Sequence, residues 1–113
     1  MYIPTGMCIS TPTSKELNMG WMIHSLANGQ CWIGSINTYM ELEEFLGKYN
    51  QNLKVVDCYD GNFFDWLAVT EEYSEEMFNA IENALSDERL DVATEDHLLV
   101  MREVLKGGNI IMG

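Results

Sequence analysis

The pair Asn28-Gly29 limits the possible folds of this chain more than any other feature, because it favours a tight β-turn between two apolar runs. The runs and the turn together span residues 21–36, WMIHSLANGQCWIGSI. A two-residue type I′ turn would place His24 opposite Ile33 in a β-hairpin. Both faces of this hairpin carry apolar side chains, so we expect it to lie in the interior of a sheet.

Three stretches of the chain have apolar residues at helical spacing. The first opens with a capping box that begins at Thr38 and continues to about Tyr49. Ser74 is the predicted N-cap of the second helix. Thr94 is the predicted N-cap of the third, which ends at Gly107.

Alternating or β-branched apolar runs predict further strands at residues 2–10, 53–59 and 109–112. Residues 11–18 have the capping pattern of a short helix. Residues 63–69 fit either a helical turn or a short strand. A strand, a helix and a strand in succession up to residue 59 would permit a right-handed crossover.

These elements predict an α+β protein. We expect a small mixed or antiparallel β-sheet that contains the Asn-Gly hairpin, with three main helices packed on it. The 113 residues are enough for one domain, 1–113, and 47% of them are hydrophobic, which is enough for a folded core.

Negative charge is concentrated in one third of the chain. The formal net charge is −12, from 18 acidic and 6 basic residues. Twelve of the acidic residues lie between Asp60 and Asp96, where Arg89 is the only Lys or Arg. Such a field attracts a basic partner and repels nucleic acid and anionic membranes. Direct binding to DNA or RNA is therefore not expected, because phosphate contacts need Lys and Arg.

The segment 60–76, DGNFFDWLAVTEEYSEE, combines acidic residues with large aromatic rings. One interpretation is a solvated helix face beside core aromatics. The other is an interaction surface, in which aromatic rings are desolvated anchors and the carboxylates steer a basic partner. In the second interpretation Trp66 is the leading anchor. The predicted partner-binding residues are Asp60, Phe63, Asp65, Trp66, Glu71, Glu72, Glu75, Glu76, Asp87, Glu88, Asp91, Glu95 and Asp96.

The cysteines and histidines do not form a recognisable catalytic or metal-binding pattern. Cys8, Cys31 and Cys58 are odd in number and widely spaced, which indicates packed thiols and no disulfide framework. A nucleophilic Cys31 beside His24 would need an electropositive setting, and the charge here has the opposite sign. No C-x-x-C or H-x-x-x-H spacing occurs, so we expect no metal site.

Other sites and locations are also not indicated. The chain has no glycine-rich phosphate loop, and residues 57–62, DCYDGN, fail the register of a calcium loop. We therefore expect no cofactor. No run of eighteen apolar residues is present, and the start of the chain lacks the pattern of a secretion signal, so we expect a cytoplasmic protein without a membrane span.

Three segments resemble, in their order, the barstar-type nuclease inhibitors. They are GQCWIGSINTYMELEEFLGKYN, YDGNFFDWL and LLVMREVLKGGNIIMG. The chain departs from that family in the spacing within YDGNFFDWL, in the strand predicted at 53–59 and in the hairpin at 21–36. We do not assign the chain to the family. The resemblance implies only an acidic inhibitor of an enzyme that acts on nucleic acid.

The sequence thus predicts an acidic, non-enzymatic module that inhibits or modulates a basic protein that handles nucleic acid. Such a partner could be a nuclease, a restriction enzyme or another defence enzyme, and the carboxylates would imitate phosphates. Two alternatives stay open. One is a homo-oligomeric structural or regulatory subunit of a phage or mobile element, paired through the edge of strand 2–10 or of the final strand. The other is a small thiol-dependent or hydrolytic enzyme.

Overall fold

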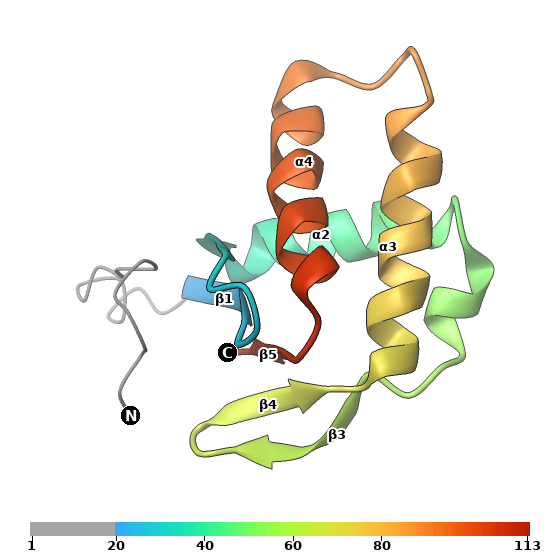
Figure 1. Ribbon diagram of the computed structural model, residues 1–113. Helices are drawn as coiled ribbons and strands as arrows, with labels where there is room; N and C mark the ends of the chain where they lie inside the picture. The colour runs from blue at the N-terminus through green and yellow to red at the C-terminus, as the bar shows by residue number, and fades with distance from the viewer. Residues whose placement is uncertain (1–19) are drawn as a thin grey trace.

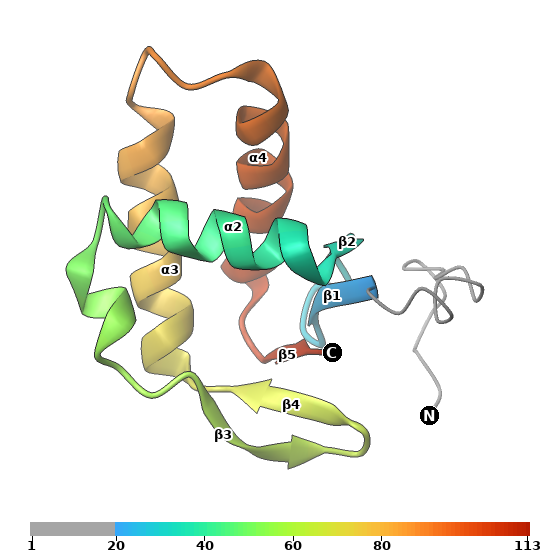
Figure 2. The same ribbon diagram turned by 180° about the vertical axis from the view of Figure 1, so that it is seen from behind.

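The computed structural model describes residues 20–113, so the strand predicted at 2–10 and the helix predicted at 11–18 lie outside the described residues. The elements in chain order are β1 (Gly20–Ser25), β2 (Cys31–Ser35), α2 (Ile36–Gly47), the 3-10 helix η2 (Gln51–Lys54), β3 (Tyr59–Phe63), β4 (Trp66–Val69), α3 (Glu71–Leu85), α4 (Val92–Gly107) and β5 (Ile110–Met112). Figures 1 and 2 show them from opposite sides.

The five strands form one antiparallel sheet in the order β2-β1-β5-β4-β3. The last strand of the chain is therefore the central one. Met112 of β5 lies opposite Ile23 of β1 on one side and Leu67 of β4 on the other. The predicted α+β class, with a sheet and three helices, is confirmed.

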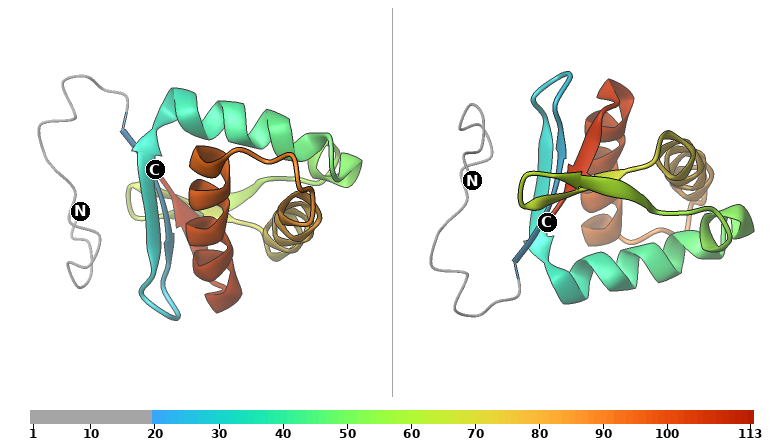
Figure 3. Two further views of the ribbon diagram at one scale, coloured as in Figure 1. Left: turned by 90° about the horizontal axis from the view of Figure 1, so that it is seen from above. Right: turned by 90° about the horizontal axis from the view of Figure 1, so that it is seen from below.

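The three α-helices lie on one side of the sheet, as the end-on views in Figure 3 show. The antiparallel pair α3 and α4 runs side by side, and α2 crosses it, behind the pair in Figure 1 and in front of it in Figure 2. The core between helices and sheet includes the fully buried side chains of Ile23, Met77, Ile81, Met101 and Met112. The apolar stripes predicted for the last two helices are the faces that form this core.

A second, smaller apolar cluster contains Met22, Trp66 and Ile111, with Cys31 packed against it. Successive side chains of a strand point to opposite faces of the sheet. Because Ile23 and Met112 belong to the helix-covered core, their neighbours Met22 and Ile111 lie on the opposite face. The sheet is thus apolar on both faces along β1 and β5.

The β1–β2 hairpin differs from its predicted register by two residues. His24 lies opposite Cys31, not Ile33, so the connection is a four-residue loop at 26–29. A shift of two keeps every side chain on its expected face, because the period of a strand is two residues. β1 is interior as predicted, whereas β2 is at an edge of the sheet that the described residues form, so the interior position of β2 stays a prediction.

The wider loop is fixed by side chains that the turn rule does not consider. The Oγ atom of Ser25 accepts the N–H of Asn28 at 3.2 Å and donates to the carbonyl of Gly108 at 2.7 Å. The Nδ2 atom of Asn28 donates to the carbonyl of Glu103 at 3.1 Å. The loop is therefore held against the end of α4, which a two-residue turn would not reach.

All three α-helices begin three or four residues earlier than the capping patterns predict. Their N-caps are Ser35, Thr70 and Asp91 in place of Thr38, Ser74 and Thr94. Each of these cap side chains accepts an N–H of the first helical turn, which meets the ordinary need of a helix start. As a result Glu71 and Glu72, and not Glu75 and Glu76, occupy the first turn of α3.

The strand predicted at residues 53–59 is wrong, and no crossover connection forms there. Asn50 caps η2 by accepting the N–H of Asn52, and Leu53 is buried from this short helix. The prediction depended on the β-branched neighbours Val55 and Val56. Val55 is 76% exposed, so these residues do not pack as part of a strand. Residues 63–69, which fitted either a helix or a strand, belong to the β3–β4 hairpin.

The burial pattern of α4 gives a test of the core. Met101→Ala removes a side chain with no exposed surface and should lower the free energy of unfolding by about 2–5 kcal/mol. The adjacent Val100→Ala, at a side chain that is 45% exposed, should change it by less than about 0.5 kcal/mol. Urea unfolding measures both values. Equal effects at the two positions would contradict this orientation of α4.

Candidate functional site

The β3–β4 hairpin carries the acidic aromatic segment out from the body of the protein, as Figure 1 shows at the base of the view. Among the described strands β3 is at an edge of the sheet, and all five of its residues are exposed. Its pairing with β4 is interrupted between Tyr59 and Asn62, where Gly61 has a φ of 88°. Such a bulge bends an edge strand and hinders its pairing with other strands. We call this hairpin, residues 59–69, the arm. Because of the bulge, the arm exposes its side chains to solvent but does not offer a regular strand edge to another strand.

Two phenylalanines stand at the tip of this arm. Phe63 and Phe64 contact each other edge to face with ring centroids 4.8 Å apart, and their exposed fractions are 37% and 76%. Phe64 has a φ of 58°, a left-handed conformation that is unfavourable for a bulky residue. An exposed aromatic pair on a strained turn is a feature that stability does not require.

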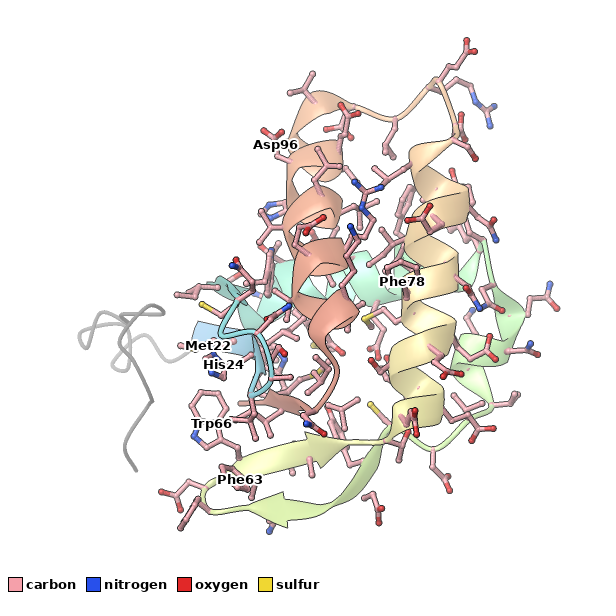
Figure 4. The ribbon with its side chains drawn as sticks, in the orientation of Figure 1. Met22, His24, Phe63, Trp66, Phe78 and Asp96 are labelled. Atoms are coloured by element: carbon pink, nitrogen blue, oxygen red, sulfur yellow. The ribbon has the colours of Figure 1, made fainter. Side chains whose placement is uncertain are left out.

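Trp66 is placed differently from its predicted role as an exposed anchor. Its side chain is only 8% exposed and belongs to the second apolar cluster with Met22 and Ile111. Figure 4 shows Trp66 beside Met22 and His24, at the side of the sheet. The aromatic rings of the segment that are exposed to solvent are those of Phe63 and Phe64.

The carboxylates at the start of α3 lie next to this arm. Thr70 caps the helix, which follows directly after β4. Glu71, Glu72 and Glu75 are exposed, while the opposite side of the helix is buried in the core. Glu76 is engaged within the protein, because its Oε1 atom accepts a hydrogen bond from Asn50 Nδ2 at 2.7 Å.

The remaining predicted site residues lie at the other end of α3. They are Asp87, Glu88, Asp91, Glu95 and Asp96, in the α3–α4 connection and the first turns of α4. A 15-residue helix rises about 1.5 Å per residue, so roughly 20 Å separates this group from the first turn of α3. Figure 4 shows Asp96 near the top of α4 and Phe63 on the arm at the opposite end. The thirteen residues therefore form two groups and not one continuous surface.

Two acidic residues of this second group, Asp87 and Asp91, form hydrogen bonds that stabilise the connection between α3 and α4. Asp87 accepts hydrogen bonds from Tyr49 Oη at 2.8 Å and from Arg89 Nη2 at 3.1 Å. These bonds, with those of Arg89 first in importance, hold the pKa of Asp87 well below its usual range. Asp91 is the N-cap of α4, and hydrogen bonds from Thr94 lower its pKa.

The exposed carboxylates at the start of α3 form no ion pair with a Lys or Arg of the described residues. Within residues 20–113 the ion pairs join Arg89 to Asp87, Arg102 to Glu82 and Glu103, and Lys106 to Glu103. Glu71, Glu72 and Glu75 take part in none of these pairs. Their charge is therefore directed to the solvent.

A cluster that the sequence did not indicate joins α2 to α3. The Oε2 atom of Glu43 accepts hydrogen bonds from the hydroxyls of Tyr39, at 3.4 Å, and Tyr73. Burial raises the pKa of both tyrosines, and the nearby Glu43 carboxylate adds to that effect. The sequence gave no signal for this cluster, because Tyr73, the partner of Glu43 on α3, is 30 residues away in the chain.

The sulfur and imidazole groups do not gather into a catalytic or metal site in the described part of the chain. Cys31 is disulfide-bonded, so the expectation of a free thiol there is wrong. Cys58 is a free thiol, and burial raises its pKa, which makes it less reactive. Burial lowers the pKa of His24. Among residues 20–113 no three His, Cys, Asp or Glu side chains are arranged to hold a metal ion.

None of the helices in the described region has the length and apolar character needed to cross a bilayer. Comparisons of the chain with protein-family models, with curated proteins and with solved structures found no match. The resemblance to barstar-type inhibitors gains no support from them. Any functional conclusion must come from the surface itself.

The hydrogen bonds of Asp87 predict a dependence of stability on pH. Because the folded protein lowers the pKa of Asp87 from 3.8, this carboxylate stabilises the fold above that pH and loses the effect as the pH falls through the lower folded value. Asp87→Asn should therefore destabilise the protein at pH 7, and its difference from the wild type should narrow steadily below about pH 4.

Urea unfolding at several pH values measures this difference. Glu88→Gln is the matched control, since it removes one negative charge from the adjacent, exposed position. A constant difference between Asp87→Asn and the wild type at all pH values would refute the role of the Asp87 charge.

Proposed function

We propose that this protein binds and inhibits, or otherwise modulates, a basic protein that handles nucleic acid. The observation that carries the proposal is the combination of an exposed aromatic tip, Phe63 and Phe64, with the exposed carboxylates of Glu71, Glu72 and Glu75. These carboxylates have no part in the ion pairs of the described residues. We name Asp60, Phe63, Phe64, Glu71, Glu72 and Glu75 the arm surface.

The two kinds of side chain support different steps of binding. Carboxylates that are not neutralised within the protein attract a cationic partner over long range and increase the rate of encounter. Aromatic rings that lose their water in the complex supply most of the affinity at such interfaces. With Trp66 buried, Phe64 takes the place of the leading anchor.

The carboxylates on α3 also suit imitation of a nucleic acid. Residues three or four apart on a helix have Cβ atoms about 5–6 Å apart, so Glu71, Glu72 and Glu75 present a short row of negative charges. A protein that binds phosphates with Lys and Arg would meet a similar row here. Occupation of its binding cleft would exclude the nucleic acid.

The homo-oligomer alternative is less well supported by the described strands. The final strand, β5, is the centre of the sheet and has both of its edges paired, so it is not available to a second copy. The free edges of the described sheet are β2 and β3. Parallel, in-register self-pairing of β3 would place Asp60 opposite its own copy, and like charges directly opposite each other are destabilising. The other proposed edge, strand 2–10, lies outside the described residues.

Two triple variants with equal charge changes test the arm surface. The first is Asp60→Lys, Glu72→Lys and Glu75→Lys, near the arm. The second is Glu88→Lys, Glu95→Lys and Asp96→Lys, at the far end of the helical pair. Each triple includes one acidic residue from the first turn of a helix, so the loss of helix-dipole stabilisation is matched. Glu76 and Asp87 are left unchanged because they bind Asn50 and Arg89.

The partner is first captured by crosslinking in the native cell and then purified. Its affinity for each variant is measured by isothermal titration calorimetry, and release of bound DNA by fluorescence anisotropy. The arm triple should weaken binding by at least about tenfold, whereas the far triple should change it by no more than about threefold. Equal weakening by both triples would show that net charge alone matters, and it would overturn the proposed arm surface.

A further inference from the structure

One cavity of the described region is lined by residues of α2, η2 and the start of α3, elements whose arrangement Figure 2 shows. Its volume is about 800 Å³. Met40, Leu53 and Val56 supply apolar lining, and Tyr73 and Cys58 complete the wall.

A carboxylate from α2 lines this cavity in a fixed position. Glu43 is half-buried, and hydroxyl groups from α2 and α3, those of Tyr39 and Tyr73, donate hydrogen bonds to one of its oxygens. Within residues 20–113 no hydrogen bond engages the other oxygen, Oε1, whose two lone pairs remain available to a ligand. A carboxylate held from two elements is preorganised, so a cation that binds it pays little to order it.

The polar groups around Glu43 are mostly acceptors. Glu41 and Glu44 also line the cavity, and Lys54 is its one cationic lining residue. The Lys54 side chain lies over Gly47, with its Cε atom against the backbone of α2. Asn37 and Lys54 supply donors, but the three carboxylates outweigh the single cation, so the site favours a cation over an anion. Neutral acceptor ligands would leave the carboxylates unpaired, which is costly at a partly buried position.

We propose that this cavity receives the guanidinium side chain of an arginine from the basic partner. This inference rests on the proposed function, because it names one contact of that partner. A guanidinium has five N–H donors and no acceptor, and its planar faces stack on aromatic rings. Its donors pair with Glu43, its plane lies against Tyr73, and its apolar stem packs on Met40 and Val56.

The probe is Nα-acetyl-L-arginine methylamide, followed by ¹⁵N and ¹³C-methyl NMR on the whole chain. The matched control ligand is the corresponding citrulline derivative, which has the same shape but carries no charge. The arginine probe should cause saturable shifts at Met40, Cys58 and Tyr73. The citrulline probe should bind at least tenfold more weakly. Equal binding of the two ligands would overturn the proposal, as would shifts confined to residues outside the cavity.

Two variants locate the binding charge. Glu43→Gln keeps an oxygen that accepts the tyrosine hydroxyls but removes the negative charge, and it should weaken arginine binding at least tenfold. Glu95→Gln removes the same charge from an exposed position on α4 and should leave binding within twofold of the wild type. Equal loss in both variants would reduce the effect to general attraction and refute the site. If Glu43→Gln fails to fold, the comparison of arginine with citrulline on the wild type still decides.

The arginine-probe experiment and the experiment with the arm triple can fail independently of each other. If the arginine probe does not bind while the arm triple still weakens the captured partner, the cavity proposal fails and the arm surface stands. If the probe binds as expected but the partner is indifferent to the arm triple, the cavity is retained and the arm surface is removed.

Discussion

The packing of α4 against the sheet is the interaction on which the rest of the structure depends. One face of this helix, with Leu98, Met101 and Val104, has no exposed surface. The helix contacts β1, β2 and α3, and it ends at Gly107, so only two residues separate it from β5 at the centre of the sheet. Burial of this face therefore fixes both the helical pair and the position of the strand that joins the two hairpins.

The sequence predicted what local patterns determine. Apolar spacing found the three helices and the strands at 21–36 and 109–112, because a buried stripe requires it. It did not find helix starts, since Ser35, Thr70 and Asp91 compete with other capping residues a turn away. The strand at 53–59 failed because Asn50 and Leu53 favour a short helix, and the packing that decides this is not local.

For the candidate site, too, the sequence predicted the features that local patterns determine and missed those that depend on non-local packing. Composition correctly placed most of the negative charge between residues 60 and 96, but the linear order gave no information on the length of α3, which separates that charge into two groups. Burial of Trp66 and exposure of Phe64 depend on which face of the arm meets β5. The contact of Tyr73 with Glu43 joins residues far apart in the chain, and no pattern in one sequence reveals it.

The central position of β5 has a consequence for how the protein acquires its shape during synthesis. The β1–β2 hairpin and the β3–β4 hairpin have no strand-to-strand pairing with each other except through residues 110–112. Each hairpin can form as soon as it leaves the ribosome, but the two remain separate sheets until these residues follow. Assembly of the whole sheet is therefore a late event, and a ribosome that pauses before Ile110 leaves two unpaired inner strand edges open to other chains.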